Sequence, residues 1–375
     1  MKYDIEVKKK LNIGAVSLNT IKAVLELSSE ITTVNYSLIS SRRQIEAASL
    51  GSGYVNNFST EDFAKFVRDC QGQTSTLKLG RDHGGPYQRS DESKLTLHDS
   101  LVVSKKSFEV DIASGYSHIH IDPEKAISHN NINNLEEFIS ISKQLVGYCL
   151  EIKKRYAIKE LDFEIGTDEG FAKHLTLNDW DLFVSSLVLF FDTKNEPPPL
   201  ILTMPLGTKV INNSNLANYY SDTELEKLQE KVDAALNLST KYGLQLKLHN
   251  SDFLSREMLD FYLSHGISNF NIAPELGVHE SNLIVNILKA QDLEHLAQKF
   301  IELSYSTNNW KRWINDQEKF SKNDCGIAAG HYIYSTLGFK QLKQEIIETG
   351  KVGDLDSMLV SEIKKLIKNY FSINE

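Results

Sequence analysis

The segment LDFEIGTDEGFAKHLTLNDWDLFVSSLVLFFDTKNEPPPLILTMPLG (residues 161–207) contains the pattern that decides the fold. Two short β-like runs, 161–166 and 200–207, flank a stretch at 177–191 whose apolar residues are spaced as in a helix. A strand, a helix and a second strand in this order predict two parallel strands joined by a right-handed crossover. We therefore expect a parallel sheet covered by helices.

The same alternation continues on both sides of this segment. Further β-like runs are LNIGAVSL (11–18), TTVNYSLI (32–39), STLKLGRD (75–82), SHIHID (117–122), LQLKLHN (244–250) and SNFNIAP (268–274). Helical patterns lie between them at 20–31, 60–70, 135–156 and 222–242, with N-caps expected at Thr60, Asn134 and Asn178. Eight such units over residues 11–275 predict an α/β fold of the (β/α)8 TIM-barrel type. A doubly wound sheet would have fewer strands and a GxGxxG turn after the first one, which this sequence lacks.

The part of the chain after the eighth unit has a different character. From about residue 281, SNLIVNILKAQ onward, the pattern is helical as far as SEIKKLIKNYFSINE at the end. No Pro- or Gly-rich linker separates this tail from the barrel, so an independent domain is not expected. We predict a barrel over residues 1–280 and a helical extension packed on it over residues 281–375.

Composition excludes several classes of function. The net charge of −9 over 375 residues argues against a general nucleic-acid binder, which needs a basic face. No run of eighteen apolar residues is present, and the N-terminus lacks the apolar core of a secretory signal. Cys70, Cys149 and Cys325 are too widely spaced for a disulfide framework or a cysteine zinc site. We expect a cytoplasmic protein that binds neither nucleic acid nor a membrane.

Polar side chains occupy one face of several predicted strands. In LQLKLHN the leucines at 244, 246 and 248 point one way, and Gln245, Lys247 and His249 point the other. The same alternation sets apart His118, His120, Asp122, Asp162, Glu164, Asn269 and Asn271. Because the apolar face must lie under the helices, the polar set points into the barrel. For any one residue an internal hydrogen-bond network is the better interpretation, but convergence of the whole set favours a functional site.

The segment LKLGRDHGGPYQ (77–88) ends a strand with an Asp-His pair and then breaks regular structure. We expect Gly84 and Gly85 to supply unusual backbone angles, and Pro86 to stiffen a loop that closes over a ligand. His83 and His249 at two strand ends, with a carboxylate such as Glu164, suit a divalent metal, with zinc favoured.

Other charged residues near the expected barrel mouth suit substrate binding. Lys209 and Lys247 are candidates for contacting substrate oxygens or phosphate, and Asp122 is a further candidate carboxylate. Arg43, in SRRQIE (41–46), carries a planar guanidinium that could clamp a phosphate or a carboxylate.

These segments also resemble a known family. GRDHGGPYQ (80–88) is similar to the Asp-His-x-Gly-Pro segment of the non-catalytic (accessory) subunits of tagatose-bisphosphate aldolases, which are relatives of class II aldolases. The resemblance continues in order through HIHIDPE (118–124), FEIGTDEG (163–170), LKLHNSD (246–252) and FNIAPELG (270–277). It implies a TIM barrel that acts on sugars or sugar phosphates. By position it implies that Asp82 moves a proton, that His83 and His249 bind zinc, and that Asn271 contacts substrate.

The sequence also departs from active class II aldolases. Their further zinc histidine after the sixth strand has no counterpart in LGTKV (206–210), and their glycine-rich phosphate loop is replaced by HNSDF (249–253). Glu164 is the candidate to complete the metal site.

The leading hypothesis is a class II aldolase-like, metal-assisted carbon–carbon lyase of carbohydrate metabolism. Its assigned groups are Asp82 and Glu164 for catalysis, His83, His249 and Glu164 for the metal, and Lys209, Lys247, Asn271, Arg43 and Asp122 for the substrate. An accessory subunit that stabilises a catalytic aldolase partner and a metal-dependent ketose epimerase are the alternatives. An oligomer is expected in each case.

Overall fold

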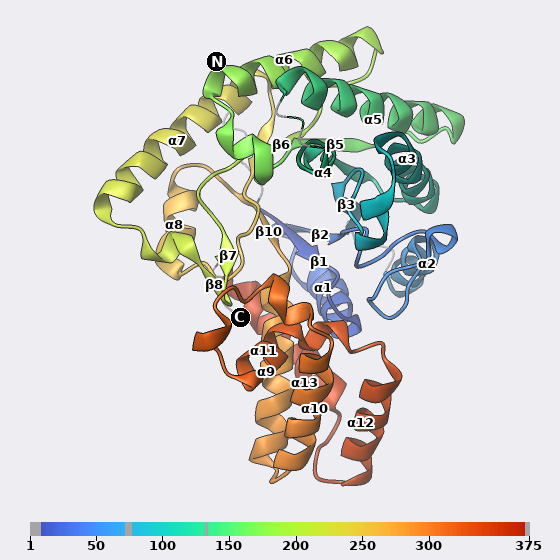
Figure 1. Cartoon of the computed structure of the whole chain (residues 1–375), viewed down its shortest axis with the longest axis vertical. Helices are drawn as coiled ribbons and strands as arrows, with labels where there is room; N and C mark the ends of the chain where they lie inside the picture. The colour runs from blue at the N-terminus through green and yellow to red at the C-terminus, as the bar shows by residue number, and fades with distance from the viewer. Residues whose placement is uncertain (1–8, 72–76, 131, 133, 372–375) are drawn as a thin grey trace.

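The computed structural model describes residues 9–71, 77–130, 132 and 134–371. Its main sheet has eight parallel strands: β1 (Lys9–Gly14), β2 (Val34–Ser40), β3 (Lys78–Gly84), β4 (His118–Ile121), β5 (Asp162–Gly166), β6 (Ile201–Thr203), β9 (Gln245–Lys247) and β10 (Asn269–Ile272). They are hydrogen-bonded in the order β10–β1–β2–β3–β4–β5–β6–β9, and a bridge between Leu248 and Phe270 brings the two ends of the sheet together. The predicted TIM-barrel fold is confirmed (Figure 1).

Helices follow the strands and surround the sheet. They are α1 (Leu18–Glu30), α2 (Thr60–Cys70), α3 (Leu97–Ser114), α4 (Glu124–His129), α5 (Leu135–Arg155), α6 (Leu177–Thr193), α7 (Asp222–Lys241), α8 (Arg256–Ser264) and α9 (Pro274–Ala290). After β6 the chain forms a small antiparallel hairpin of β7 (Val210–Ile211) and β8 (Ser214–Asn215). Among the described residues, no helix combines the length and the apolar composition that crossing a bilayer needs.

Capping explains where several helices begin. Asn134 caps α5 as predicted, accepting a hydrogen bond from the Glu136 N–H. The predicted caps Thr60 and Asn178 are wrong by one and two positions. Ser59 caps α2, and Thr176 caps α6, because these residues have extended backbone angles that aim the hydroxyl at the first free N–H groups.

Period-two alternation in the strands builds the core. Ile119, Ile121, Phe163 and Ile165 face the helices, and each is at most 3% exposed. Burying a large apolar side chain of this kind contributes roughly 1.5–3 kcal/mol. The opposite face of the same strands carries the polar set, so the packing of the core fixes which side chains enter the barrel.

The tail forms the helices α10 (Glu294–Ser306), α11 (Lys322–Ala329), α12 (Leu337–Glu348) and α13 (Leu355–Asn369), drawn in orange and red below the barrel in Figure 1. Helix α13 packs along α1 and α9, and its Ile363 and Ile367 join the barrel's own apolar core. The boundary predicted at residue 280 falls inside α9, and the division at that point stays a prediction.

Candidate functional site

The backbone leaves regular strand geometry at the Asp82–His83 pair. The register of β3 against β4 shifts between Arg81 and Gly84. His83 has φ of +45°, in the left-handed region that is unfavourable for residues other than glycine. The His83 N–H donates to Nδ1 of His120 at 3.2 Å. Bulges of this kind often lie beside active sites, because they redirect a side chain that regular pairing would point elsewhere.

The two glycines that follow permit close packing against β4. A Cβ on Gly85 would lie 2.1 Å from the carbonyl oxygen of Asp122, and one on Gly84 would meet the Phe108 ring at 2.4 Å. Neither glycine has a positive φ, whereas the neighbouring His83 does. The expectation that these glycines supply unusual angles is therefore wrong. They are needed because no side chain fits between this loop and the adjacent strand.

Three histidine rings meet at the carboxyl ends of the strands. The ring centroids of His83 and His120 are 5.2 Å apart, those of His83 and His249 are 5.0 Å apart, and those of His120 and His249 are 5.2 Å apart. Three imidazoles that share one tetrahedral ion at about 2.1 Å place their centroids on the order of 5 Å apart. The triangle of rings therefore has the size that a common metal ion requires.

One nitrogen of each ring is held by an acceptor behind it. The pairs are His83 Nδ1 with Asp122 Oδ2 at 2.7 Å, His120 Nε2 with the Gly166 carbonyl oxygen at 2.8 Å, and His249 Nε2 with Glu164 Oε1 at 2.8 Å. Metal-binding histidines usually donate their second N–H to a carboxylate or a carbonyl in this way. The predicted Asp122 thus orients His83 rather than lying in the open cavity.

The other nitrogen of each ring faces a carboxylate oxygen. His83 Nε2 lies 4.0 Å from Asp82 Oδ2, His120 Nδ1 lies 3.8 Å from Asp82 Oδ1, and His249 Nδ1 lies 3.7 Å from Asp168 Oδ1. These separations exceed a hydrogen bond and approach the roughly 3.4 Å between neighbouring ligands of one zinc ion. Asp82, His120 and His249 bring one ligand atom each to within 4.8 Å of one another.

The trio with that spacing differs in part from the predicted metal ligands. His249 belongs to it, and the ring of His83 lies beside it. His120 was not chosen as a ligand, although the HIHID alternation had already placed it on the inward face. Glu164 accepts from four donors, two on each oxygen: Thr203, His249, His118 and Lys247, at 2.6 to 2.8 Å. Its carboxylate is thus saturated by the protein, and its predicted roles stay predictions.

The charges of this cluster are set by proximity. Burial alone would raise the pKa of Asp82, but nearby His83, His120 and Lys247 hold that pKa well below its usual value. Burial would lower the pKa of His83, but the carboxylates of Asp82 and Asp122 raise it to about 10. Asp82 is therefore ionised at neutral pH. It also accepts a hydrogen bond from the predicted substrate-binding residue Asn271 at 3.3 Å.

A cavity of about 210 Å³ opens above this cluster. Among the predicted residues, those that line it are Asp82, His83, His249, Asn271 and Arg43. Lys247 lies below the surface of the cavity, completely buried between Glu164 and Asp82, and Lys209 is exposed on the approach to β7, outside the lining.

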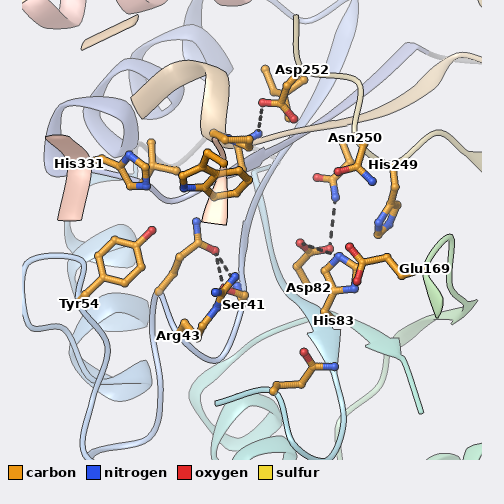
Figure 2. Close-up of a pocket in the computed structure, with 18 of the residues that line it drawn as sticks. Ser41, Arg43, Tyr54, Asp82, His83, Glu169, His249, Asn250, Asp252 and His331 are labelled. Atoms are coloured by element: carbon orange, nitrogen blue, oxygen red, sulfur yellow. Dashed lines mark hydrogen bonds and ion pairs between the residues drawn. The ribbon is translucent and has the colours of Figure 1, made fainter. Parts of the chain in front are cut away.

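Part of the cavity wall comes from the tail. Trp313, His331 and Tyr332 line it, and the Tyr332 ring packs on Tyr54 with centroids 4.7 Å apart. Figure 2 shows Tyr54 and His331 on the side of the cavity opposite Asp82, His83 and His249. The sequence pattern predicted only packing for these tail residues, because nothing in local periodicity reveals which barrel loop a distant segment will meet.

No protein-family model and no curated protein sequence matches this chain. Solved structures of similar fold include a probable tagatose 6 phosphate kinase from Sinorhizobium meliloti, with a TM-score of 0.75 and 13% identity, covering 98% of this chain and 100% of that one. A fructuronate-tagaturonate epimerase from Cohnella laeviribosi has a TM-score of 0.57 and 12% identity, covering 97% and 81%. A fructose-bisphosphate aldolase from Campylobacter jejuni has a TM-score of 0.51 and 13% identity, covering 97% and 90%. At these identities the likeness shows the fold alone.

Proposed function

We propose that this chain is a metal-dependent enzyme of carbohydrate metabolism that breaks or forms a carbon–carbon bond in a sugar or sugar phosphate, as class II aldolases do. The observation that carries the proposal is the meeting of Asp82 with His83, His120 and His249 beneath one cavity. The names of the three similar structures all concern ketoses or their acids and phosphates, which supports this substrate class.

The donor set fits a divalent ion, with zinc favoured. His120 and His249 would hold it, and His83 would join through Nε2, because the second nitrogen of each ring already has an acceptor. Asp82 lies beside these nitrogens and keeps its carboxylate for the substrate proton. A bound divalent ion supplies a Lewis acid that polarises a ketose carbonyl and stabilises the negative charge that develops on its oxygen. The predicted ligand role of Glu164 is replaced in this proposal by a positioning role towards His249 and Lys247.

Asp82 is the group that moves the proton. In the cleavage direction its carboxylate accepts the proton of the hydroxyl two carbons from the carbonyl. The bond between the carbon that bears this hydroxyl and the carbon next to the carbonyl breaks, its electron pair passes towards the carbonyl, and an aldehyde and an enediolate result. Asn271 holds one oxygen of Asp82 in place, and the ammonium of Lys247, 3.9 Å from that same oxygen, keeps the carboxylate ionised.

Metal content and turnover test the proposal together. Purified protein should contain about one divalent ion per chain by mass spectrometry, and His120→Ala and His249→Ala should lose it while retaining their circular dichroism spectra. His295→Ala, on the exposed face of α10, is the matched control and should keep the ion. The metal-loaded wild type should also cleave a ketose phosphate, and Asp82→Asn should abolish this cleavage. A wild-type protein that takes up no metal, even when supplemented, sinks the mechanism.

A ketose epimerase is the second candidate, favoured by the epimerase similarity that extends over 97% of this chain. Asp82 would then take a proton from a carbon beside the carbonyl, and a proton returned to the opposite face would give an isomer with the mass of the substrate. The lack of a histidine in LGTKV after the sixth strand, where active class II aldolases have a zinc ligand, keeps an accessory role as the alternative outcome. In that case His249→Ala would leave the activity of an added catalytic aldolase partner unchanged. Size-exclusion chromatography with light scattering tests the expected oligomer.

A further inference from the structure

Three residues that line the cavity have side-chain hydrogen-bond donors without a partner in the part of the chain that the structure describes. Among the described residues, the guanidinium of Arg43 and the ammonium of Lys125 form no ion pair within 4.0 Å. The side-chain amide of Gln88 is 5% exposed, and its Nε2 has no acceptor. A buried donor left unpaired costs about 1–3 kcal/mol, so a ligand that supplies acceptors would be favoured here.

These donors come from three neighbouring strands. Arg43 follows β2, Gln88 follows β3, and Lys125 lies in the first turn of α4 after β4. Because β2, β3 and β4 are adjacent in the sheet, their carboxyl-terminal loops meet on one side of the barrel mouth. The two cations line the same cavity, and burial first and then the charge of Arg43 lower the pKa of Lys125.

The backbone beneath Arg43 is held firmly while its side chain is free. The Arg43 carbonyl oxygen accepts from the Tyr54 N–H at 3.1 Å. The preceding Arg42 is completely buried, pairs with Glu46 at 2.6 Å and donates to the carbonyl oxygen of Gly85 at 3.1 Å. Adjacent arginines thus have opposite roles, one joining the loops after β2 and β3 and the other presenting a positive charge to the cavity.

The carboxylates in the lining do not neutralise this pair. Asp82 is engaged with the histidines, and burial, then repulsion from Glu275, raises the pKa of Asp252 to about 8. Asp252 is therefore largely neutral at pH 7. Glu169 remains, and it makes no ion pair within 4.0 Å with either cation. Two cations without an ion pair therefore lie at one side of the cavity, and Glu169, Asp122 and Glu124 act on Lys125 only from longer distances.

We propose that Arg43, Lys125 and Gln88 form an anion subsite that holds the phosphate or carboxylate of an acidic sugar while its carbonyl end lies over Asp82 and the histidines. The identification of the ligand as a sugar rests on the proposed function. The anion is bound over β2, β3 and β4, so the acidic end of the ligand is anchored away from the HNSDF segment that follows β9. A planar guanidinium and an ammonium together suit an oxyanion with several acceptor oxygens.

Calorimetric titration of the full chain tests this subsite with D-tagatose, D-tagatose 6-phosphate and D-tagaturonate. Both acidic sugars should bind at least about tenfold more tightly than the neutral one. Arg43→Met and Lys125→Met should each weaken the binding of the acidic sugars by about ten- to a hundredfold and change that of D-tagatose less than about twofold. Lys159→Met, an exposed lysine on the loop before β5 at the opposite end of the barrel, is the matched control and should change neither.

The outcomes separate the two proposals, because metal content is measured on the same samples. The subsite alone is overturned if metal-loaded wild type binds all three sugars equally. It is also overturned if metal-loaded Lys125→Met loses affinity for D-tagatose as much as for the acidic sugars. Metal-free protein whose binding of the acidic sugars still depends on Lys125 overturns the proposed chemistry and supports the subsite. If neither acidic sugar nor inorganic phosphate binds, the subsite is refuted. A preference for the phosphate over the uronate, or the reverse, identifies the anion.

Discussion

Replacing Glu280 with glutamine should change how the stability of this protein depends on pH. Glu280 lies on α9 where it faces α1, is 1% exposed, and accepts one hydrogen bond from Asn19 at 2.8 Å. Its second oxygen has no hydrogen-bond partner among the described residues. Burial raises the pKa of Glu280 from 4.5 to about 7, and the hydrogen bond from Asn19 offsets only part of this effect. The folded protein therefore binds this proton more tightly than the unfolded chain does.

The sign and size follow from linkage. When the pKa of a carboxyl is higher in the folded state than in the unfolded chain, the free energy of unfolding falls as pH rises between the two pKa values, here from 4.5 to about 7. Between pH 5 and pH 8 the loss amounts to roughly 2.5 kcal/mol, because one pKa unit corresponds to about 1.36 kcal/mol. Glutamine is neutral at every pH and retains the acceptor for Asn19. The free energy of unfolding of the variant, relative to that of the wild type, should therefore rise by about this amount between pH 5 and pH 8.

Urea unfolding followed by circular dichroism at both pH values measures the difference. Glu257→Gln, at an exposed position on α8, is the matched control and should follow the wild type. Using the difference between variant and wild type removes the contributions of all other titrating groups. If the difference in free energy of unfolding between Glu280→Gln and the wild type stays constant from pH 5 to pH 8, the reasoning is refuted.

Three further substitutions test the site and its support. Asp122→Asn should lower zinc affinity by about 10- to 100-fold with the fold retained, because it removes the charge behind His83; competition with a chelator measures this, and unchanged affinity contradicts it. Gly85→Ala should destabilise the protein by about 1–3 kcal/mol, because its Cβ would lie 2.1 Å from the Asp122 carbonyl oxygen, whereas Gly353→Ala, with open space around it, should be nearly neutral in thermal unfolding. Lys247→Met should cost about 3–5 kcal/mol in urea unfolding, because Glu164 would lose its buried cation; a cost below 1 kcal/mol would show that the remaining donors suffice.

The barrel could be predicted because its pattern is local. Period-two alternation over a few residues predicts each strand. The same alternation placed His118, Glu164 and Lys247 in the barrel interior, where each is at most 2% exposed. The order of strands then follows from the short, right-handed connections that parallel sheets allow. Nothing beyond neighbouring residues was needed for that part of the fold.

The site was harder to predict because its details are set across the barrel. His120 shares its inward face with many other polar groups, and regular alternation would set His83 beside Arg81 on the other face. Only the bulge at β3 brings the two rings together. Lys125 has no sequence signal that sets it apart from the other lysines of the chain. Trp313 and Tyr332 follow the barrel in sequence, and no local signal connects them to a cavity formed by residues far earlier in the chain.

The reactive groups and part of the cavity wall come from different parts of the chain. The histidines and Asp82 stand on barrel strands or directly after them, whereas Trp313 and Tyr332 belong to a segment that follows the barrel and is attached to the β7–β8 hairpin through the Asn212 N–H. Insertions or exchanges within residues 307–332 would alter the size of the entrance without moving a reactive group. Related barrels could therefore keep one chemistry while their substrate preferences diverge. Sequence differences in their tails would then follow substrate preference more closely than differences in their strands.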